Sequence, residues 1–301
     1  IIDRESRVVL GLDPHLQLFP PPLADAAAST DRETVAEVVE RFCMEVLEAA
    51  SEVVAAVKPQ IAFFERLGPP GWAVLERLCK RARGAGLLVI ADAKRGDIGS
   101  TAEAYAGYLL GTSEGLGGLD ADAMTASPYL GSDSLAAYLP YLSQGKGLFV
   151  LAKTSNPSSA DLQDRMTSGP GGDQPMYSAV GALVQKLSPL RGDRGYSPLG
   201  LVVGATSPSQ AQSLREAFPD LPFLVPGYGA QGASAEDVVS AFDRRGLGAV
   251  VNASRSLVFA YRAEEYSQLA PSQWAVATRR ECERMTRDIN EALAKAGRLE
   301  P

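Results

Sequence analysis

The sequence predicts an α/β protein folded as a single (β/α)8 TIM barrel. Short apolar runs recur along the 301 residues, and each is followed by a turn and a segment with the period of an amphipathic helix. Eight such units occur, which favours a closed barrel over an open doubly wound sheet. Because the composition does not shift along the chain, we predict one domain over residues 1–301, with insertions near 155–173 and 190–198.

The predicted strands carry little polar alternation, as expected of parallel strands that are buried on both faces. In chain order they cover residues 8–13, 53–58, 87–92, 121–125, 148–153, 199–206, 223–226 and 249–252.

The predicted helices are marked by apolar stripes. The three clearest lie near residues 35–46, 75–82 and 282–293, and Thr30 or Asp31 can cap the first of them. Weaker helical stretches cover residues 100–111, 132–142, 174–187, 207–218 and 234–244. The polar insertion at 155–173 is longer than an ordinary connection, which is typical of either a functional lid or a disordered segment.

The composition excludes several classes of protein. A net charge of −7 repels nucleic acid and anionic lipid, and no apolar run approaches the roughly 18 residues of a membrane span. His15 is the sole histidine, so a multi-histidine metal site cannot be built. Cys43, Cys79 and Cys282 lie far apart without a C-x-x-C motif, which indicates buried free thiols in a reducing compartment. The first residues lack the pattern of a secretory signal, and we expect a cytoplasmic protein.

A charged cluster, Asp92-Ala93-Lys94-Arg95-Gly96-Asp97, follows the third predicted strand. Residues two apart on a strand point to the same side, so Asp92 and Lys94 can both face the mouth of the barrel. If Lys58 joins them, neighbouring opposite charges keep each lysine cationic, as a proton donor rather than a base. That suits a reaction in which negative charge develops on carbon without a metal or organic cofactor. The alternative is a structural network of ion pairs.

A second cluster follows the seventh and eighth predicted strands. It comprises the glycine-rich run 226–232 and then Asn252-Ala253-Ser254-Arg255-Ser256. Loops at these two positions form the common phosphate site of such barrels, where glycines let backbone N–H groups approach an anion. The glycines alone could simply make tight turns, but Arg255 and Gln231 beside them favour a phosphorylated substrate.

The polar residues that follow the strands form one pattern over nearly the whole chain. They are Asp13, Lys58, Asp92-x-Lys94-x-x-Asp97-Ile98 with Thr101, Ser155, Pro226-Gly227 with Gln231, and Arg255. This pattern resembles the orotidine 5′-phosphate decarboxylase family, most closely its longer bacterial form. Short-form members usually differ at Arg95-Gly96 and Gly99-Ser100, and they lack an insertion as long as 155–173.

The resemblance implies a cofactor-free homodimer that converts orotidine 5′-phosphate to UMP and carbon dioxide, the last step of de novo pyrimidine nucleotide synthesis. It implies that Lys94 donates a proton to C6 and that Asp92 lies beside the departing carboxylate. It places Lys58 and Asp13 at the ribose and Ser155 at the pyrimidine. Gln231 and Arg255 would bind the phosphate together with the backbone that starts at Pro226, and Asp97, Ile98 and Thr101 would reach into the neighbouring subunit's site.

Two other functions remain open from the residues. A sugar-phosphate decarboxylase or aldolase of the same barrel type, such as 3-keto-L-gulonate 6-phosphate decarboxylase or hexulose-phosphate synthase, shares D-x-K-x-x-D but uses magnesium. A non-catalytic barrel that binds a phosphorylated metabolite is the second alternative. Both would act on a small molecule rather than on nucleic acid or a membrane.

Overall fold

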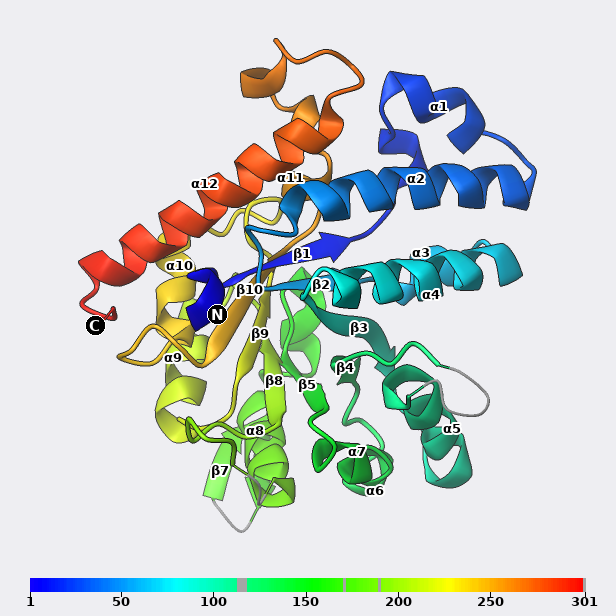
Figure 1. The fold of residues 1–301 in the computed structure, drawn as a ribbon. Helices are drawn as coiled ribbons and strands as arrows, with labels where there is room; N and C mark the ends of the chain where they lie inside the picture. Colours follow the sequence, from blue (N-terminus) through cyan, green and yellow to red (C-terminus); the bar gives the residue numbers. More distant parts are fainter. Residues whose placement is uncertain (113–117, 170–171, 189–190, 300–301) are drawn as a thin grey trace.

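A closed barrel of parallel strands forms the centre of the molecule, which confirms the predicted (β/α)8 fold (Figure 1). The computed structural model describes residues 1–112, 118–169, 172–188 and 191–299. The barrel strands are β1 (Val8–Leu12), β2 (Ala56–Pro59), β3 (Leu88–Arg95), β4 (Ala123–Ala126), β5 (Gly147–Lys153), β8 (Leu199–Val203), β9 (Phe223–Pro226) and β10 (Ala249–Ala253). Their order around the ring is β1-β10-β9-β8-β5-β4-β3-β2, and β1 pairs with both β2 and β10.

Helices surround the barrel on its outer side (Figure 1). The α-helices are α1 (Pro21–Ala27), α2 (Arg32–Ala50), α3 (Ile61–Glu65), α4 (Pro69–Gly84), α5 (Gly99–Leu110), α6 (Asp133–Ala136), α7 (Leu139–Leu142), α8 (Met176–Leu187), α9 (Pro208–Ala217), α10 (Ala235–Val238), α11 (Arg255–Val258) and α12 (Trp274–Lys295). The 3-10 helices are η1 (Ile2–Arg4), η2 (Leu16–Leu18), η3 (Pro157–Asp161), η4 (Val239–Ala241), η5 (Ala260–Arg262) and η6 (Glu264–Tyr266).

The three helices with clear apolar stripes are α2, α4 and α12. Asp31 caps α2, because its carboxylate accepts a hydrogen bond of 3.0 Å from the Thr34 N–H. The weaker stretch at 132–142 is divided into the short helices α6 and α7, and the stretch at 234–244 holds the short helix α10 followed by η4. The sequence patterns gave no sign of α1 or α3, which are too short to show a helical period.

Several strand boundaries differ from the predicted ones, and β3 continues to Arg95 rather than ending at residue 92. β2 begins at Ala56 rather than at residue 53, because Val53 still closes the end of α2 through its N–H to the Ala50 carbonyl. β4 begins at Ala123 rather than at residue 121. β8 ends at Val203, since the N–H of Gly204 bonds the Lys153 carbonyl at 2.7 Å and the chain then turns away.

Most of the buried apolar side chains lie in two separate layers. Inside the barrel lies a small cluster of buried residues, namely Val9, Ala56, Ile90, Ala123, Val202 and Leu224. A much larger core fills the space between the strands and the surrounding helices, and it includes Phe42, Phe64 and Trp274. The interior is therefore filled with side chains rather than open as a channel, and this filling leaves a ligand site only at a mouth of the barrel.

The insertion after β5 is largely ordered in its described part. It contains η3 and an antiparallel hairpin of β6 (Met166–Gly169) and β7 (Gly172–Pro175), which pairs Thr167 with Gln174. Residues 170 and 171 of the predicted insertion at 155–173, and residues 189 and 190 at the start of the one at 190–198, lie outside the described residues.

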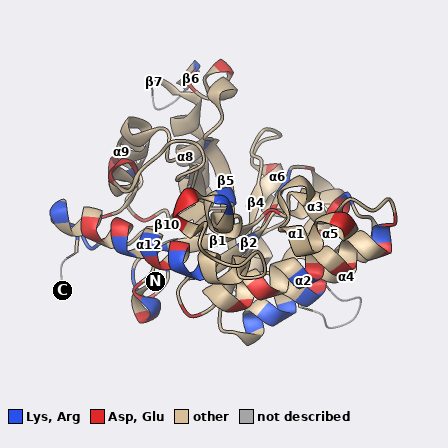
Figure 2. Cartoon of the chain, turned by 90° about the horizontal axis from the view of Figure 1, so that it is seen from above, with Lys and Arg blue, Asp and Glu red and all other residues tan. Residues whose placement is uncertain are grey.

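The outer helices carry acidic and basic residues side by side rather than in separate patches (Figure 2). Several pairs join neighbouring helices: Arg77 of α4 contacts Glu40 of α2 at 2.5 Å, and Arg81 contacts Glu48 at 3.0 Å. In the described part of the chain, no helix combines the length and apolar character needed to cross a membrane.

Candidate active site

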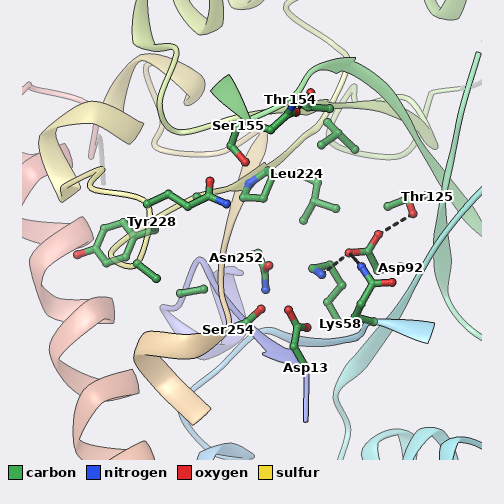
Figure 3. A pocket seen from close by; sticks show the side chains of 18 of the residues that line it. Asp13, Lys58, Asp92, Thr125, Thr154, Ser155, Leu224, Tyr228, Asn252 and Ser254 are labelled. Atoms are coloured by element: carbon green, nitrogen blue, oxygen red, sulfur yellow. Dashed lines mark hydrogen bonds and ion pairs between the residues drawn. The ribbon is translucent and has the colours of Figure 1, made fainter. Parts of the chain in front are cut away.

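A cavity of about 490 Å³ opens at the carboxyl ends of the barrel strands (Figure 3). Eight of the predicted site residues line it: Asp13, Lys58, Asp92, Lys94, Ser155, Pro226, Gln231 and Arg255. They lie in or directly after β1, β2, β3, β5, β9 and β10. Since parallel strands of a barrel all end on one side, residues far apart in sequence converge there.

A carboxylate between two ammonium groups dominates the charge of this cavity. Asp92 Oδ2 lies 2.5 Å from Lys58 Nζ, and Asp92 Oδ1 lies 2.6 Å from Lys94 Nζ. The side chains of Lys58 and Asp92 are only 5% and 7% exposed, whereas that of Lys94 is 45% exposed. Lys94 is therefore the cation of this array with the freest access to a ligand in the cavity.

Asp92 is held as an anion by these partners. Its burial alone would raise the pKa of the carboxyl, but the charges of Lys58 and Lys94 outweigh that effect and lower the pKa to about 2. Gln60 Nε2 donates to Oδ2 at 3.0 Å, and the Thr125 hydroxyl donates to Oδ1 at 2.9 Å. Each carboxylate oxygen thus accepts two hydrogen bonds, which fixes the orientation of Asp92.

Asp13 adds a second carboxylate to the cavity, directly after β1 (Figure 3). Its Oδ1 atom is buried and has no hydrogen-bond partner among the described residues. Nearby, Asn252 lines the same cavity and donates from Nδ2 to the Val9 carbonyl at 3.0 Å. A buried carboxylate oxygen without a partner needs a donor, and a ligand hydroxyl in the cavity could supply one.

The glycine-rich loop after β9 forms the opposite wall of the cavity. Gly227 has a φ of +105°, and a Cβ at this position would lie 2.8 Å from Gln231 Oε1 and 3.1 Å from Ser155 Cβ. Glycine is therefore required for Ser155 and Gln231 to lie this close. Arg255 lines the same cavity and makes no ion pair within the described residues, which leaves its guanidinium available to an anion.

Asp97, Ile98 and Thr101 do not line this cavity, although the same resemblance singled them out. Ile98 is 51% exposed, and Thr101 is exposed on the first turn of α5. A single chain therefore does not bring these three residues into the lining of its own cavity.

Lys153 also follows the pattern of a polar residue at a strand end, but its side chain does not reach the main cavity. The ammonium is buried and donates to Ser159 Oγ at 3.0 Å and Asp164 Oδ1 at 2.7 Å. It thereby anchors the insertion that follows β5. In the same segment, Gln163 lines the cavity and makes two hydrogen bonds of 2.8 Å with Thr154.

The sequence analysis missed several polar groups of the cavity, among them Gln60, Thr125 and Gln163. Gln60 and Thr125 lie at the carboxyl ends of β2 and β4, so their position was a usable signal. Gln163 reaches the cavity only through the fold of the insertion. No cluster of three or more His, Cys, Asp or Glu side chains suited to a metal ion occurs among the described residues.

The fold and the site define a class: a (β/α)8 barrel with an array of alternating charges and a glycine-rich, arginine-bearing wall at its ligand mouth. The chain belongs to the Orotidine 5′-phosphate decarboxylase / HUMPS family, whose sequence profile matches residues 6–268.

Proteins named for the same family align with this chain over nearly their full length. Orotidine 5′-phosphate decarboxylase of Rhodopirellula baltica is 46% identical over 283 residues, which cover 93% of this chain and 92% of that protein. The protein of the same name from Roseiflexus castenholzii is 42% identical and covers 88% of both chains. The crystal structure of a putative orotidine 5′-phosphate decarboxylase from Streptomyces avermitilis has a TM-score of 0.77 at 36% identity, covering 97% of this chain and 93% of that one.

Proposed function

We propose that this protein decarboxylates orotidine 5′-phosphate to UMP and carbon dioxide, the last step of de novo pyrimidine nucleotide synthesis. The observation that carries the proposal is the Lys94 ammonium, held at 2.6 Å from Asp92 and half exposed to the cavity. The relatives named for this activity, at up to 46% identity over most of the chain, support it.

The reaction needs a cation at the carbon that loses carbon dioxide. When the C6–carboxylate bond breaks, its electron pair stays on C6 in the plane of the ring, where it cannot delocalise into the π system. The nearby Lys94 ammonium stabilises this charge as it forms. It then gives a proton to C6, which leaves a neutral amine that solvent reprotonates. Asp92, as an anion beside the reacting carboxylate, keeps the ammonium in place.

The rest of the substrate fits the remaining polar groups of the cavity. Asp13, with its unpartnered buried oxygen, and Lys58 suit the ribose hydroxyls. Ser155 suits the polar edge of the pyrimidine. Arg255 and Gln231, with the loop backbone from Pro226 onward, suit the phosphate. Phosphate binding far from C6 can then contribute to the rate by ordering the charged array.

We propose that two chains form a homodimer with composite sites in which Asp97, Ile98 and Thr101 act in the partner's cavity. These residues do not line the cavity of their own chain. Large apolar side chains are exposed in the same region: Ile98 after β3, and Tyr129 and Leu130 after β4, at 51%, 79% and 48%. Exposed apolar groups of this kind mark surfaces that bind a partner. The free thiols of the three cysteines suit a cytoplasmic location.

The activity is tested by following the absorbance of orotidine 5′-phosphate with protein that has been stripped of metal by EDTA. We expect turnover that is unaffected by the chelator. Turnover that requires added magnesium and accepts sugar phosphates instead would favour the other activities of this barrel type. Tight UMP binding without turnover would indicate a binding protein.

The role of Lys94 is tested by Lys94→Ala. We expect a loss of several orders of magnitude in kcat with UMP binding retained, because the ammonium acts mainly in the transition state. Near-normal turnover would contradict the assignment. For the composite site, an Asp97→Ala chain mixed with a Lys94→Ala chain should recover activity, since one site of each heterodimer is then intact.

A further inference from the structure

Thr125, near the end of β4, forms hydrogen bonds with the backbone N–H of Lys94 and with the Asp92 carboxylate, which is also the ion-pair partner of the Lys94 ammonium. The Lys94 N–H donates to Thr125 Oγ1 at 3.0 Å. The same hydroxyl donates to Asp92 Oδ1 at 2.9 Å (Figure 3). A backbone N–H can only donate and an ionised carboxylate can only accept, so the direction of both hydrogen bonds is fixed. Thr125 is 1% exposed, so water does not compete with either bond.

The backbone at Lys94 needs such support. Its φ is +47°, in the left-handed region that residues with a side chain disfavour. The pairing of β3 with β4 shifts in register between Ala91 and Arg95, so Lys94 lies in a bulge rather than in a regular strand. Strained conformations of this kind persist only where their surroundings hold them.

The contacts around this bulge form a closed ring. Lys94 is bound at its main-chain nitrogen by Thr125 and at Nζ by Asp92, and Thr125 and Asp92 are bound to each other. The ring therefore fixes both the start and the tip of the lysine side chain. On the next residue, the Arg95 carbonyl accepts a hydrogen bond of 2.8 Å from the Ser127 N–H, which ties the far side of the bulge to the chain after β4.

We propose that Thr125 is a positioning residue for the decarboxylation. Its hydroxyl holds Lys94 in the left-handed conformation and orients Asp92, so that the ammonium meets C6 at the geometry of the transition state. This inference rests on the proposed function for its kinetic consequence, but the hydrogen-bonded ring itself does not depend on the identity of the substrate.

Two substitutions separate the hydroxyl from the packing of the side chain. Thr125→Val keeps the branched shape and removes the hydroxyl, whereas Thr125→Ser keeps the hydroxyl and removes the methyl group. If the hydroxyl positions Lys94, we expect Thr125→Val to lower kcat by roughly ten- to hundredfold, the effect of losing a hydrogen bond to a charged group. The KM and the dissociation constant of UMP should change by less than about threefold, and Thr125→Ser should retain a kcat close to that of the unchanged protein.

Two kinetic outcomes would overturn the proposal. One is an unchanged kcat in Thr125→Val. The other is an equal loss in Thr125→Val and Thr125→Ser, because the methyl group and its packing would then be responsible. If the wild-type protein does not turn over orotidine 5′-phosphate, the proposed function is wrong. A separate measurement then tests whether Thr125 holds the backbone of Lys94.

That measurement is hydrogen exchange of the Lys94 amide in the unchanged protein, labelled with 15N-lysine. It requires neither turnover nor a substituted protein, so it also applies if Thr125→Val does not fold. We expect slow exchange, because the buried hydroxyl of Thr125 accepts from this amide. Exchange at the rate of an unprotected amide would overturn the proposal.

Discussion

Replacement of Asp92 by asparagine tests whether the charged array stabilises the fold as well as serving the reaction. The pKa of Asp92 is lowered from 3.8 to about 2, since Lys58 and Lys94 outweigh the cost of burial. At 1.36 kcal/mol per pKa unit, a lowering of this kind corresponds to a few kcal/mol of folding free energy at neutral pH. The asparagine variant also leaves the buried Lys58 ammonium without its counter-charge, which adds to the loss.

The assay is urea unfolding at one fixed protein concentration, because the stability of the proposed dimer would depend on concentration. We expect Asp92→Asn to lose at least about 2 kcal/mol relative to the wild-type protein, since the loss of the carboxylate charge and the unpaired Lys58 ammonium both destabilise the fold. Because the pKa is lowered in the folded state, the contribution of the carboxylate is fully present above pH 3.8 and is lost as the pH falls through about 2. The difference between the two proteins should therefore stay constant from pH 7 to pH 5.

Two further variants sharpen this test. Asp25→Asn removes an exposed carboxylate on α1 and should leave stability within about 0.5 kcal/mol. The double variant Lys58→Met/Asp92→Asn should be more stable than the sum of the two single changes predicts, because both buried charges are removed together. If Asp92→Asn had the same free energy of unfolding as the wild-type protein, the desolvation of the carboxylate would cancel the stabilisation from its ion pairs. That result would contradict the reasoning.

Three other properties can be predicted from the structure. Gly204→Ala should raise the KM, because a Cβ at this position would lie 2.8 Å from the backbone of Ser155; Gly84→Ala, with no atom within 4 Å, is the matched control. Lys153→Met should increase proteolysis of the insertion after β5 in timed digests, because the buried anchor to Asp164 is lost; digestion at the unchanged rate would contradict this. The three cysteine thiols should resist iodoacetamide until the protein unfolds, because burial raises the pKa of each, and rapid labelling of the folded protein would contradict this.

The barrel could be predicted because its strands are buried on both faces and its helices on one. Continuous apolar runs for the strands therefore alternate along the sequence with the apolar period of amphipathic helices. The position of the cavity then follows from the fold class, because parallel strands bring their carboxyl ends together. That is why Asp13, Lys58 and Arg255 could be assigned to one site although they lie far apart in sequence.

The local geometry of the site could not be predicted in the same way. Simple alternation along a strand places Asp92 and Lys94 on one side, but the structure reaches this pairing through a bulge at a lysine with positive φ. A lysine in the sequence gives no sign of that conformation. Lys153 shows the converse limit, because it stands at a strand end as Lys58 does, whereas a carboxylate in the following insertion holds its ammonium outside the cavity. Such pairings depend on the path of a long connection, which no short-range period encodes.

The closure of the barrel has a consequence for how this protein is made. Strand β1 pairs with β2 along one edge and with β10 along the other. The edge that pairs with β10 stays unpaired until the ribosome has synthesised residues 249–253. An open strand edge on an incomplete chain can pair wrongly with another nascent chain. The ligand mouth also depends on this closure, since it joins Asp13, which follows β1, to Arg255, which follows β10. A chain truncated before residues 249–253 therefore leaves one edge of β1 unpaired and also lacks Arg255 in the ligand site.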